Sequence, residues 1–225
     1  MKHFAVIPAR AGSVGLPGKN RMFFANTADF LESVPWFDER VVSTDDTVVR
    51  KMALDRKFRV IDRPADLAGP DVSIKPVLEH VVESLKLPDD AVLWLFYLPV
   101  LHKDREDFEI ARREIEQTSI GSLCTFVPAK THPYDCWSYN EGQGELQKFL
   151  QNDVFRRQDK PTAWAHYHYV CCLRVGVLPC LNNELIAPNT HPQFLDAETA
   201  EKLVEIDTPG DLERWQRLQT MTSAD

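Results

Sequence analysis

The first twenty residues of this 225-residue chain restrict its fold more than any other segment. An apolar run at residues 4–7 leads directly into residues 8–20, P-A-R-A-G-S-V-G-L-P-G-K-N, which contain three glycines, one Arg and one Lys. Glycines let backbone N–H groups approach an anion, and the two cations neutralise its charge. Because ligands in α/β folds bind beyond the carboxyl ends of the strands, this pattern predicts a strand followed by a phosphate-binding loop.

The spacing within this loop excludes two well-known phosphate-binding motifs. The P-loop of ATPases and GTPases has four residues between its first Gly and its Gly-Lys pair, which is followed by Ser or Thr. Here five residues separate Gly12 from Gly18, and Asn20 follows Lys19. The dinucleotide fingerprint G-x-G-x-x-G also fails, because glycines 12, 15 and 18 are evenly spaced. An ordinary surface loop is the remaining alternative, and the flanking cations Arg10 and Lys19 argue against it.

Strand-like and helix-like stretches alternate along the first 130 residues. Hydrophobic periodicity predicts strands at residues 3–7, 40–43, 58–61, 91–98 and 120–127, and helices at 45–57, 74–85 and 104–117, with a short amphipathic stretch at 27–33. The run at 91–98 is continuously apolar, which is typical of a strand buried on both faces. The alternation predicts an α/β fold with a mostly parallel sheet and helices on both faces.

The alternation of predicted strands and helices ends after residue 127. Residues 132–158 are polar, and Asn140, Gly142 and Gly144 predict the turn of a hairpin. The remaining elements are an aromatic-rich strand at 163–173, a short helix or turn at 196–204, a strand end at 205–207 and a closing helix at 209–221. We therefore expect one domain over residues 1–225, with a small insertion at residues 131–162.

Composition limits the partners that we expect. The formal net charge of −8 argues against nucleic acid, because phosphate backbones require a basic surface. The sequence has no apolar run of membrane-spanning length, and residues 1–3 lead directly into the first strand without a signal segment. The five cysteines are odd in number and two are adjacent, which favours reduced thiols. These features predict a cytoplasmic protein that binds neither nucleic acid nor membrane.

The first loop resembles the opening of the CMP-acylneuraminate (CMP-sialic acid) synthetases, a family of sugar-activating cytidylyltransferases. Their signature reads approximately A-R-x-x-S-K-G-[LI]-P-x-K-N, and it is matched by Arg10, Ser13, Gly15, Leu16, Pro17, Lys19 and Asn20. Val14 departs from it, because the family usually has Lys there. The resemblance implies a Rossmann-like nucleotidyltransferase sheet and a Mg²⁺-dependent enzyme, which moves CMP from CTP onto an acid and releases pyrophosphate.

Two further segments extend the resemblance in the same order along the chain. Residues 41–46, V-V-S-T-D-D, match the family motif V-S-T-D-[DES], although capping of a helix by Thr44 or Asp45 explains them equally well. Residues 62–73 match R-P-x-x-L-A-x-D-x-[SA] with a one-residue shift, and a surface ion pair is the alternative for Arg63. The resemblance implies that the nucleotide is bound by Ala9, Arg10, Ala11, Gly12, Ser13, Gly15, Lys19, Asn20, Arg63 and Ser73.

A pair of acidic residues near the C-terminus is the candidate metal site. Glu205 and Asp207 lie two residues apart in an extended segment, so their side chains point the same way. Carboxylate oxygens facing a phosphate site suit Mg²⁺. The family motif [DE]-I-D-T-x-x-D-L matches residues 205–212 and implies the same role, with Asp211 capping the last helix. Solvated charges are the alternative reading of the pair.

The insertion also follows the family pattern. His132-Pro133 and the segment 155–161, F-R-R-Q-D-K-P, match the family's H-P and R-x-Q-x-x-P. In the family this hairpin mediates dimerisation, so the resemblance implies a homodimer.

The acceptor region departs from the family. Residues 95–102 read L-F-Y-L-P-V-L-H where relatives have L-Q-P-T-S-P-[LF]-R, and residues 166–172 read H-Y-H-Y-V-C-C where relatives have R-N-G-A-I-Y. Since these motifs bind the sugar in relatives, we expect CTP and metal binding to be kept and the acceptor to differ. A small anionic acceptor, such as a shorter sugar acid or a phosphonate, would be bound by Tyr97, His102, Arg157, His166, Tyr167 and His168.

Several alternatives remain open at this stage. No general base is evident, and His168 is the candidate because imidazole titrates near neutral pH; Arg10 and Lys19 are the other candidate catalytic residues. His166, His168 and Cys172 are the three residues that strand alternation would align for a structural zinc ion, and aromatic strand packing explains them without a metal. The chain as a whole is also compatible with a non-catalytic nucleotide-binding protein, or with an interaction protein that keeps only the fold.

Overall fold

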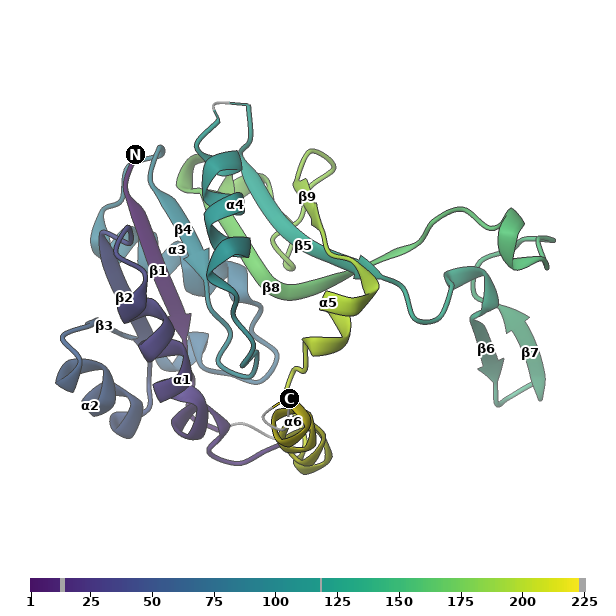
Figure 1. Ribbon diagram of the computed structural model, residues 1–225, viewed down its shortest axis with the longest axis horizontal. Coiled ribbons are helices and arrows are strands. Elements are labelled where there is room, and N and C mark those ends of the chain that lie inside the picture. The colour runs from purple at the N-terminus through teal and green to yellow at the C-terminus, as the bar shows by residue number, and fades with distance from the viewer. Residues whose placement is uncertain (13–14, 118, 223–225) are drawn as a thin grey trace.

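A seven-stranded sheet forms the centre of the molecule (Figure 1). The computed structural model describes residues 1–12, 15–117 and 119–222, so Ser13 and Val14 of the first loop lie outside the described residues. The strand order is β3-β2-β1-β4-β8-β5-β9. The strands are β1 (His3–Pro8), β2 (Glu39–Thr44), β3 (Arg59–Asp62), β4 (Val92–Leu95), β5 (Ser122–Pro128), β8 (Trp164–Arg174) and β9 (His191–Phe194).

Four of the six strand pairings are parallel. Strands β3, β2, β1 and β4 run in the same direction, and β9 runs parallel to β5. Strand β8 lies antiparallel between β4 and β5. The predicted mostly parallel α/β sheet is therefore confirmed. Strand β9 was not predicted, because its sequence H-P-Q-F is short and contains a proline; an edge position tolerates that residue.

Helices cover both faces of the sheet, as predicted. The two faces follow from strand alternation, since Ala5 and Ile7 of β1 pack into one core and Phe4 and Val6 into the other. Helices α1, α2 and α4 contribute to the first core and α3 to the second. The helices are α1 (Lys19–Ser33), α2 (Thr47–Asp55), α3 (Ile74–Leu85), α4 (Arg105–Ile115), α5 (Ala197–Lys202) and α6 (Pro209–Thr222), with short 3₁₀ turns η1 (Ala65–Leu67), η2 (Pro133–Asp135), η3 (Arg157–Asp159) and η4 (Val175–Cys180).

Local chemistry explains where these helices begin. Helix α3 has the predicted bounds, and its apolar residues lie at helical spacing. Helix α1 begins at Lys19, eight residues before the predicted stretch, and its N-cap Gly18 has a φ of 75°, a left-handed conformation that glycine adopts without strain. Helix α2 is capped by Asp46, whose carboxylate accepts from the N–H groups of Val48 and Val49, rather than by Thr44 or Asp45.

Strand β8 contains a three-residue bulge opposite β5. Cys171 pairs with Cys124, but the next residue of β5, Thr125, pairs with Tyr167, so residues 168–170 have no partner in register. The Thr125 hydroxyl closes this gap, because it accepts a hydrogen bond from the Val170 N–H and donates one to the Val170 carbonyl. Such a bulge bends the strand and changes the direction of its side chains.

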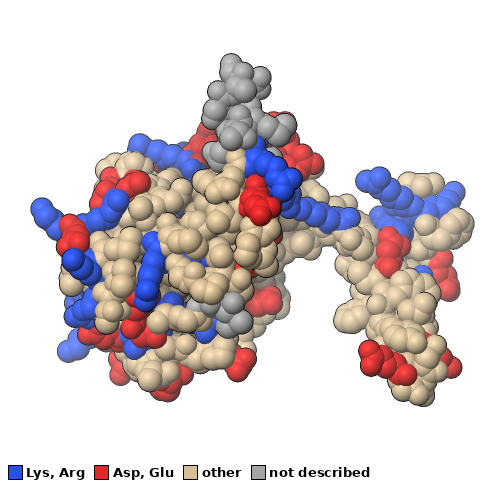
Figure 2. Space-filling model, turned by 90° about the horizontal axis from the view of Figure 1, so that it is seen from below, with Lys and Arg blue, Asp and Glu red and all other residues tan. Residues whose placement is uncertain are grey.

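Residues 129–163 form an arm that projects from the sheet (Figure 1). It contains the predicted hairpin, formed by strands β6 (Trp137–Asn140) and β7 (Glu145–Lys148). The Asn140 side chain accepts hydrogen bonds from the N–H groups of Gly142 and Gln143, which stabilises the turn. Figure 2 shows that a narrow neck joins the arm to the body. Several large apolar side chains of the arm face solvent, and Phe155 is 85% exposed.

Within the described part of the chain, no helix combines the length and the apolar character needed to cross a membrane.

A buried histidine lies in the core at the amino end of the sheet. His3 accepts a hydrogen bond at Nδ1 from the Trp94 indole, and its Nε2 lies 3.3 Å from a Glu116 carboxylate oxygen. Burial lowers the pKa of His3, although Glu116 and Asp38 oppose this effect and Arg112 adds to it. Protonation of Nδ1 would break the hydrogen bond from Trp94, so the folded protein favours the neutral ring.

We expect His3 to make the protein less stable in acid. Because the pKa in the folded state lies below the usual 6.5, the unfolded state binds the proton more tightly. The contribution of His3 to the free energy of unfolding is therefore complete above pH 6.5 and decreases as the pH falls below this value. Urea unfolding at pH 7.5 and 5.5 measures this change. His3→Gln should show a smaller loss of unfolding free energy than wild type, whereas His132→Gln on the arm should behave like wild type. Equal losses in the two variants would contradict the assignment.

Candidate active site

A cavity of about 470 Å³ lies at the carboxyl ends of β1 and β4. It collects residues from the first loop, from the segments after β3 and β4, from β8 and from the segment before α6. Ten residues predicted from the sequence line it: Arg10, Gly15, Lys19, Asn20, Arg63, Ser73, Tyr97, His168, Glu205 and Asp207. The structure thus brings together side chains that lie up to 197 positions apart, from Arg10 to Asp207.

Hydrogen bonds to neighbouring strands and helices fix the first loop. The Ala9 N–H donates to the carbonyl of Ser43 at the end of β2, and the Ala11 N–H donates to the Asp45 carboxylate. The Asn20 amide on α1 donates to the Arg10 carbonyl, 2.8 Å away. These contacts hold the loop against β2 and α1. Ala9 and Ala11 therefore serve the loop through their backbone and do not line the cavity.

The loop leads into the amino end of α1. Its N-cap residue is Gly18, which has no side chain to offset the positive end of the helix dipole. The first turn, K-N-R-M, adds the positive charges of Lys19 and Arg21. A smaller cavity of about 120 Å³ lies here and shares Arg10 and Asn20 with the large one. Loop, helix end and cations together form a site suited to a polyphosphate.

Arg63 provides a buried positive charge. Only 8% of its surface is exposed, and its guanidinium donates to the Ser43 hydroxyl and carbonyl. Burial lowers the pKa of Arg63 to about 10, so the side chain remains protonated at neutral pH. The alternative of a surface ion pair is therefore wrong: the side chain is held by a strand end and faces the cavity.

The two predicted metal-binding carboxylates lie in a segment that is anchored to the chain that follows β4. Val100 forms an antiparallel bridge with Glu205, and the Ile206 N–H donates to the Pro99 carbonyl. Burial raises the pKa of Glu205, and the nearby Asp207 raises it further. Asp207 forms an ion pair with Lys19 of α1. The last helix begins with a reciprocal cap, because Asp211 accepts from the Thr208 N–H and Thr208 accepts from the Asp211 N–H.

This pair of carboxylates fits a magnesium ion. Both side chains line the cavity next to the cations of the first loop, and both present oxygen, the ligand atom that Mg²⁺ prefers. Their proximity disfavours ionisation of Glu205, and a bound divalent cation would remove this cost. Mg²⁺ usually binds one or two protein carboxylates and completes its shell with water and substrate phosphate, so two ligands suffice.

Tyr97 and His168 form another wall of the cavity. Their rings lie 4.7 Å apart, and His168 belongs to the bulged segment of β8. Burial lowers the pKa of His168, and the neighbouring His166 lowers it further, while Glu184 and Asp207 oppose the change. Burial also raises the pKa of Tyr97. At neutral pH this wall presents a neutral imidazole and a neutral phenol.

The other predicted acceptor residues do not line the cavity. His102 is half-buried beside Tyr169, and Arg157 is exposed on the arm. The His166 ring lies behind His168, with 4.7 Å between ring centres. The Tyr167 hydroxyl is buried, and among the described residues it has no hydrogen-bond partner. Gly12 lines only the smaller cavity, and Ser13 lies outside the described residues.

The zinc alternative is not supported by the described residues, which contain no cluster of three or more His, Cys, Asp or Glu side chains arranged to hold a metal. Cys172 packs into one core while Cys171 packs into the other. The three-residue bulge between His166 and Cys172 breaks the simple alternation on which the alignment of these ligands depended.

Five further residues line the large cavity that were not predicted from the sequence. Val72, Ile74 and Val77 form an apolar wall around the start of α3, Pro8 is the last residue of β1, and Pro99 lies in the segment after β4. The apolar wall has a signal, because Val72 lies within the motif at 62–73 and Ile74 and Val77 come shortly after it. Arg21, which lines the smaller cavity, is also visible in the sequence as a third cation next to Lys19.

Gly15 marks a close contact between the first loop and the acidic segment. A Cβ atom at this position would lie 2.5 Å from the Asp207 carbonyl oxygen, closer than a carbon atom can approach backbone. We expect Gly15→Ala to lower the free energy of unfolding by about 1–3 kcal/mol, because the two segments must move apart. Gly142→Ala on the arm is the control, since its Cβ would find the nearest atom at 3.5 Å. Thermal unfolding of both variants measures the difference, and equal melting temperatures would refute the contact.

Comparisons with known proteins agree with the sequence resemblance. No family model matches the chain. N-acylneuraminate cytidylyltransferase of Streptococcus agalactiae serotype III (strain NEM316) is 28% identical over 169 residues, which cover 71% of this chain and 40% of the relative. The enzyme of the same name from serotype V (strain ATCC BAA-611 / 2603 V/R) is 25% identical over the same coverage. The matched part therefore spans less than half the length of these relatives.

Solved structures of cytidylyltransferases share the fold. A CMP:2-keto-3-deoxy-manno-octonic acid synthetase complexed with CTP superposes with a TM-score of 0.69 and 18% identity, over 99% of this chain and all of that chain. The 2-C-methyl-D-erythritol 4-phosphate cytidylyltransferase of Francisella tularensis superposes with a TM-score of 0.63 and 14% identity, over 95% and 98% of the two chains. The chain thus has the Rossmann-like fold of cytidylyltransferases and is similar in sequence to the N-acylneuraminate enzymes.

Proposed function

We propose that this protein is a cytidylyltransferase, which transfers CMP from CTP to an oxygen atom of a small acid and releases pyrophosphate. The observation that carries the proposal is the cavity in which Arg10, Lys19 and Arg63 face the carboxylates of Glu205 and Asp207. This combination suits a polyphosphate with a divalent cation. The curated relatives and the structural neighbours named above are all cytidylyltransferases, which supports CTP as the nucleotide.

The reaction requires positioning and neutralisation of charge. An acceptor oxygen attacks the α-phosphorus of CTP, and pyrophosphate leaves from the opposite side. Arg10, Lys19 and the amino end of α1 hold the triphosphate and stabilise the charge that develops on its oxygens. Backbone N–H groups of the glycine-rich loop add to this site. Ser13 belongs to the same proposal, although it lies outside the described residues.

The nucleoside lies against α3 in this proposal. Val72, Ile74 and Val77 offer apolar contact to the flat base, and Ser73 and Asn20 offer hydrogen-bonding groups. Arg63 adds a fixed charge beside them.

Glu205 and Asp207 are the proposed ligands of Mg²⁺. When bound, the ion neutralises charge on the α-phosphate and orients the acceptor oxygen. The chain's own contribution is to hold the two carboxylates in position through the backbone contacts of this segment with Pro99 and Val100.

The acceptor lies beside Tyr97 and His168. Relatives are named for sugar acids, and this chain lacks the polar residues that contact the sugar in that family, so we propose a smaller anionic acceptor. The neutral His168 imidazole is suited to accept the proton that the acceptor oxygen loses. Arg157 lies on the arm, so a role in acceptor binding requires a second copy of the chain. The exposed apolar side chains of the arm support such a homodimer.

One observation favours a second candidate function, a nucleotide-binding protein without catalysis. The segment after β4 carries Phe96, Tyr97 and Leu98 in place of the polar residues of relatives. Such a protein would bind CTP and release no pyrophosphate with any acceptor.

A pyrophosphate-release assay separates these candidates. The protein is incubated with each nucleoside triphosphate, Mg²⁺ and a panel of sugar acids and phosphonates, and binding of CTP is measured in parallel by calorimetry. Of the nucleoside triphosphates, we expect only CTP to support pyrophosphate release with an acceptor. Lys19→Ala should weaken CTP binding by about 10- to 100-fold, because a charge-assisted hydrogen bond to phosphate is lost.

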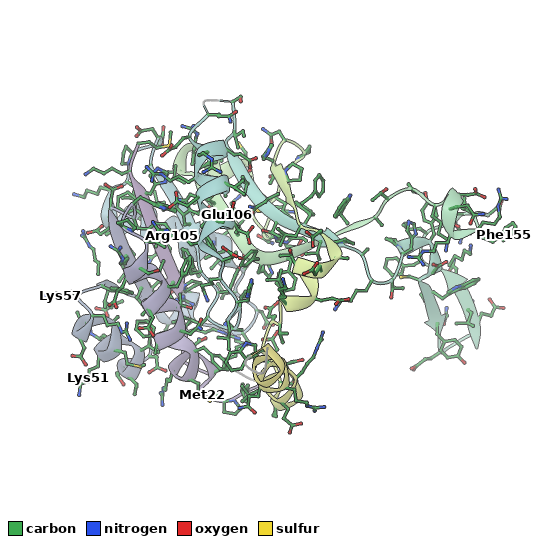
Figure 3. The ribbon with its side chains drawn as sticks, in the orientation of Figure 1. Met22, Lys51, Lys57, Arg105, Glu106 and Phe155 are labelled. Atoms are coloured by element: carbon green, nitrogen blue, oxygen red, sulfur yellow. The ribbon has the colours of Figure 1, made fainter. Side chains whose placement is uncertain are left out.

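Lys51→Ala is the matched control, because Lys51 projects from α2 away from the cavity (Figure 3). It should bind CTP like wild type. CTP binding without turnover across the panel would favour the second candidate, and absence of nucleotide binding would exclude both.

Removal of the metal provides an independent test of the acidic pair. We expect EDTA to abolish pyrophosphate release and added Mg²⁺ to restore it, because two carboxylates and a triphosphate remain mutually repulsive without a cation. Asp207→Asn should raise the Mg²⁺ concentration for half-maximal activity by about tenfold or more. Asp55→Asn, an exposed acid at the end of α2, should leave that concentration unchanged. Equal Mg²⁺ dependence in the two variants would remove Asp207 from the metal site.

A further inference from the structure

Two cysteine side chains meet across the antiparallel pair of strands β5 and β8. Cys124 and Cys171 are direct partners in the register, and their sulfur atoms lie 3.5 Å apart and share a hydrogen bond. Both side chains point into the same core and are buried, with 0% and 3% exposure. Neither thiol has a role in the function proposed above.

The remaining cysteines are placed differently. Cys172 follows Cys171 directly but points into the core on the opposite face of the sheet. Cys136 lies on the arm, and Cys180 is exposed at the end of η4. All five are free thiols. Cys172 is therefore a natural control for any chemistry assigned to its neighbour.

The surroundings make Cys124 the more acidic thiol of the pair. The hydrogen bond with Cys171 lowers the pKa of Cys124, and the nearby His166 imidazole lowers it further, while burial opposes both. The same hydrogen bond, together with burial, raises the pKa of Cys171. The thiolate is the nucleophilic form of cysteine, so Cys124 is the group that reacts first with an oxidant.

We propose that Cys124 and Cys171 form a reversible disulfide when the protein meets a peroxide. The Cys124 thiolate attacks one peroxide oxygen, so that an S–O bond forms, the O–O bond breaks and hydroxide leaves to become water. The Cys171 sulfur then attacks the sulfenic acid. An S–S bond forms, the S–O bond breaks, and a second water leaves with the proton of Cys171. Two thiols are oxidised by two electrons, and one peroxide is reduced to two waters.

The strand geometry permits this bond. Directly opposed residues of antiparallel strands have Cα atoms about 4.5–5.5 Å apart, within the range of about 4.4–6.8 Å found in disulfides. The sulfur atoms must approach from 3.5 Å to about 2.05 Å. The bulge of β8 ends at Val170, the residue before Cys171, so the strand has irregular backbone next to the bond that can absorb this movement.

Residues 181–190 determine access to the thiols. This segment lacks regular helix or strand, packs Leu181 and Leu185 against the same core, and places the Leu185 carbonyl 3.9 Å from the Cys124 sulfur. Local opening of such a segment requires less free energy than global unfolding and admits a molecule as small as hydrogen peroxide. The same segment contacts the cavity wall, since the Ser73 hydroxyl donates to the Asn183 side chain.

The pair also lies directly behind the cavity. Tyr97, which lines the cavity, packs against both cores beside the two thiols. The disulfide would therefore join β5 to β8 at the bulge that carries His168.

Mass spectrometry of the folded full-length chain tests the proposal. The reduced protein is treated with hydrogen peroxide, denatured, and alkylated with N-ethylmaleimide. We expect the intact mass before alkylation to lie two hydrogens below that of the reduced protein, and two of the five thiols to escape alkylation. Tryptic digestion should yield a cross-linked pair of peptides containing Cys124 and Cys171. Dithiothreitol added before alkylation should restore all five thiols.

Serine variants identify the partners. Cys124→Ser and Cys171→Ser should abolish the cross-link, whereas Cys172→Ser should keep it. Circular dichroism shows whether each variant is folded. If a variant is unfolded, the peptide map of the wild-type protein still identifies the cross-linked cysteines. A wild-type protein that oxidises at exposed Cys180 while Cys124 and Cys171 stay alkylatable would overturn the proposal, as would a cross-link to Cys172. Because no readout requires CTP or turnover, the result is independent of the proposed enzyme activity.

Discussion

Parallel pairing of β1 with β2 and β4 is the constraint on which the candidate site depends. It brings the carboxyl ends of the three strands to one edge of the sheet, where the first loop, the 44–46 turn and the 96–100 segment meet. The acidic segment is then added from the far end of the chain, because Val100 pairs with Glu205 and Pro99 accepts from Ile206. This bridge acts together with the direct contacts that Asp207 makes with Gly15 and Lys19.

The direction and the bulge of strand β8 shape one wall of the cavity. The strand runs against the direction of its neighbours, and its bulge places His168 in the cavity while Tyr169 turns into the core. The Tyr169 hydroxyl accepts from the Asp104 N–H and donates to Asp107, which holds α4 against the sheet. One irregular strand therefore shapes the proposed acceptor side of the cavity and anchors the helix beside it. The proposed nucleotide side, by contrast, is built from regular strand ends.

Much of the fold can be predicted from the sequence because hydrophobic periodicity is local. Helix α3 follows directly from apolar residues at helical spacing, whereas the first half of α1 buries the adjacent pair Phe23 and Phe24 together with the polar Asn20, which gives no such spacing. The direction of β8 and the existence of β9 depend on long-range pairing, which no local pattern records. The same limit applies to the site. Arg10, Lys19, Glu205 and Asp207 belong to sequence motifs, but the entry of His168 into the cavity without His166 depends on the three-residue bulge of β8.

The ion pair between Lys19 and Asp207 shows how the cavity can exchange one set of charges for another. The Asp207 side chain is 54% exposed, so its attraction to Lys19 is screened by water and is worth at most about 1 kcal/mol. In the proposed function, a triphosphate would compete for Lys19 and a divalent cation would compete for Asp207. The triphosphate would replace Asp207 as the partner of Lys19, and the cation would replace Lys19 as the partner of Asp207. The two ligands also attract each other. The ion pair therefore keeps both side chains in position without a ligand and costs little to break, so CTP and Mg²⁺ should bind cooperatively.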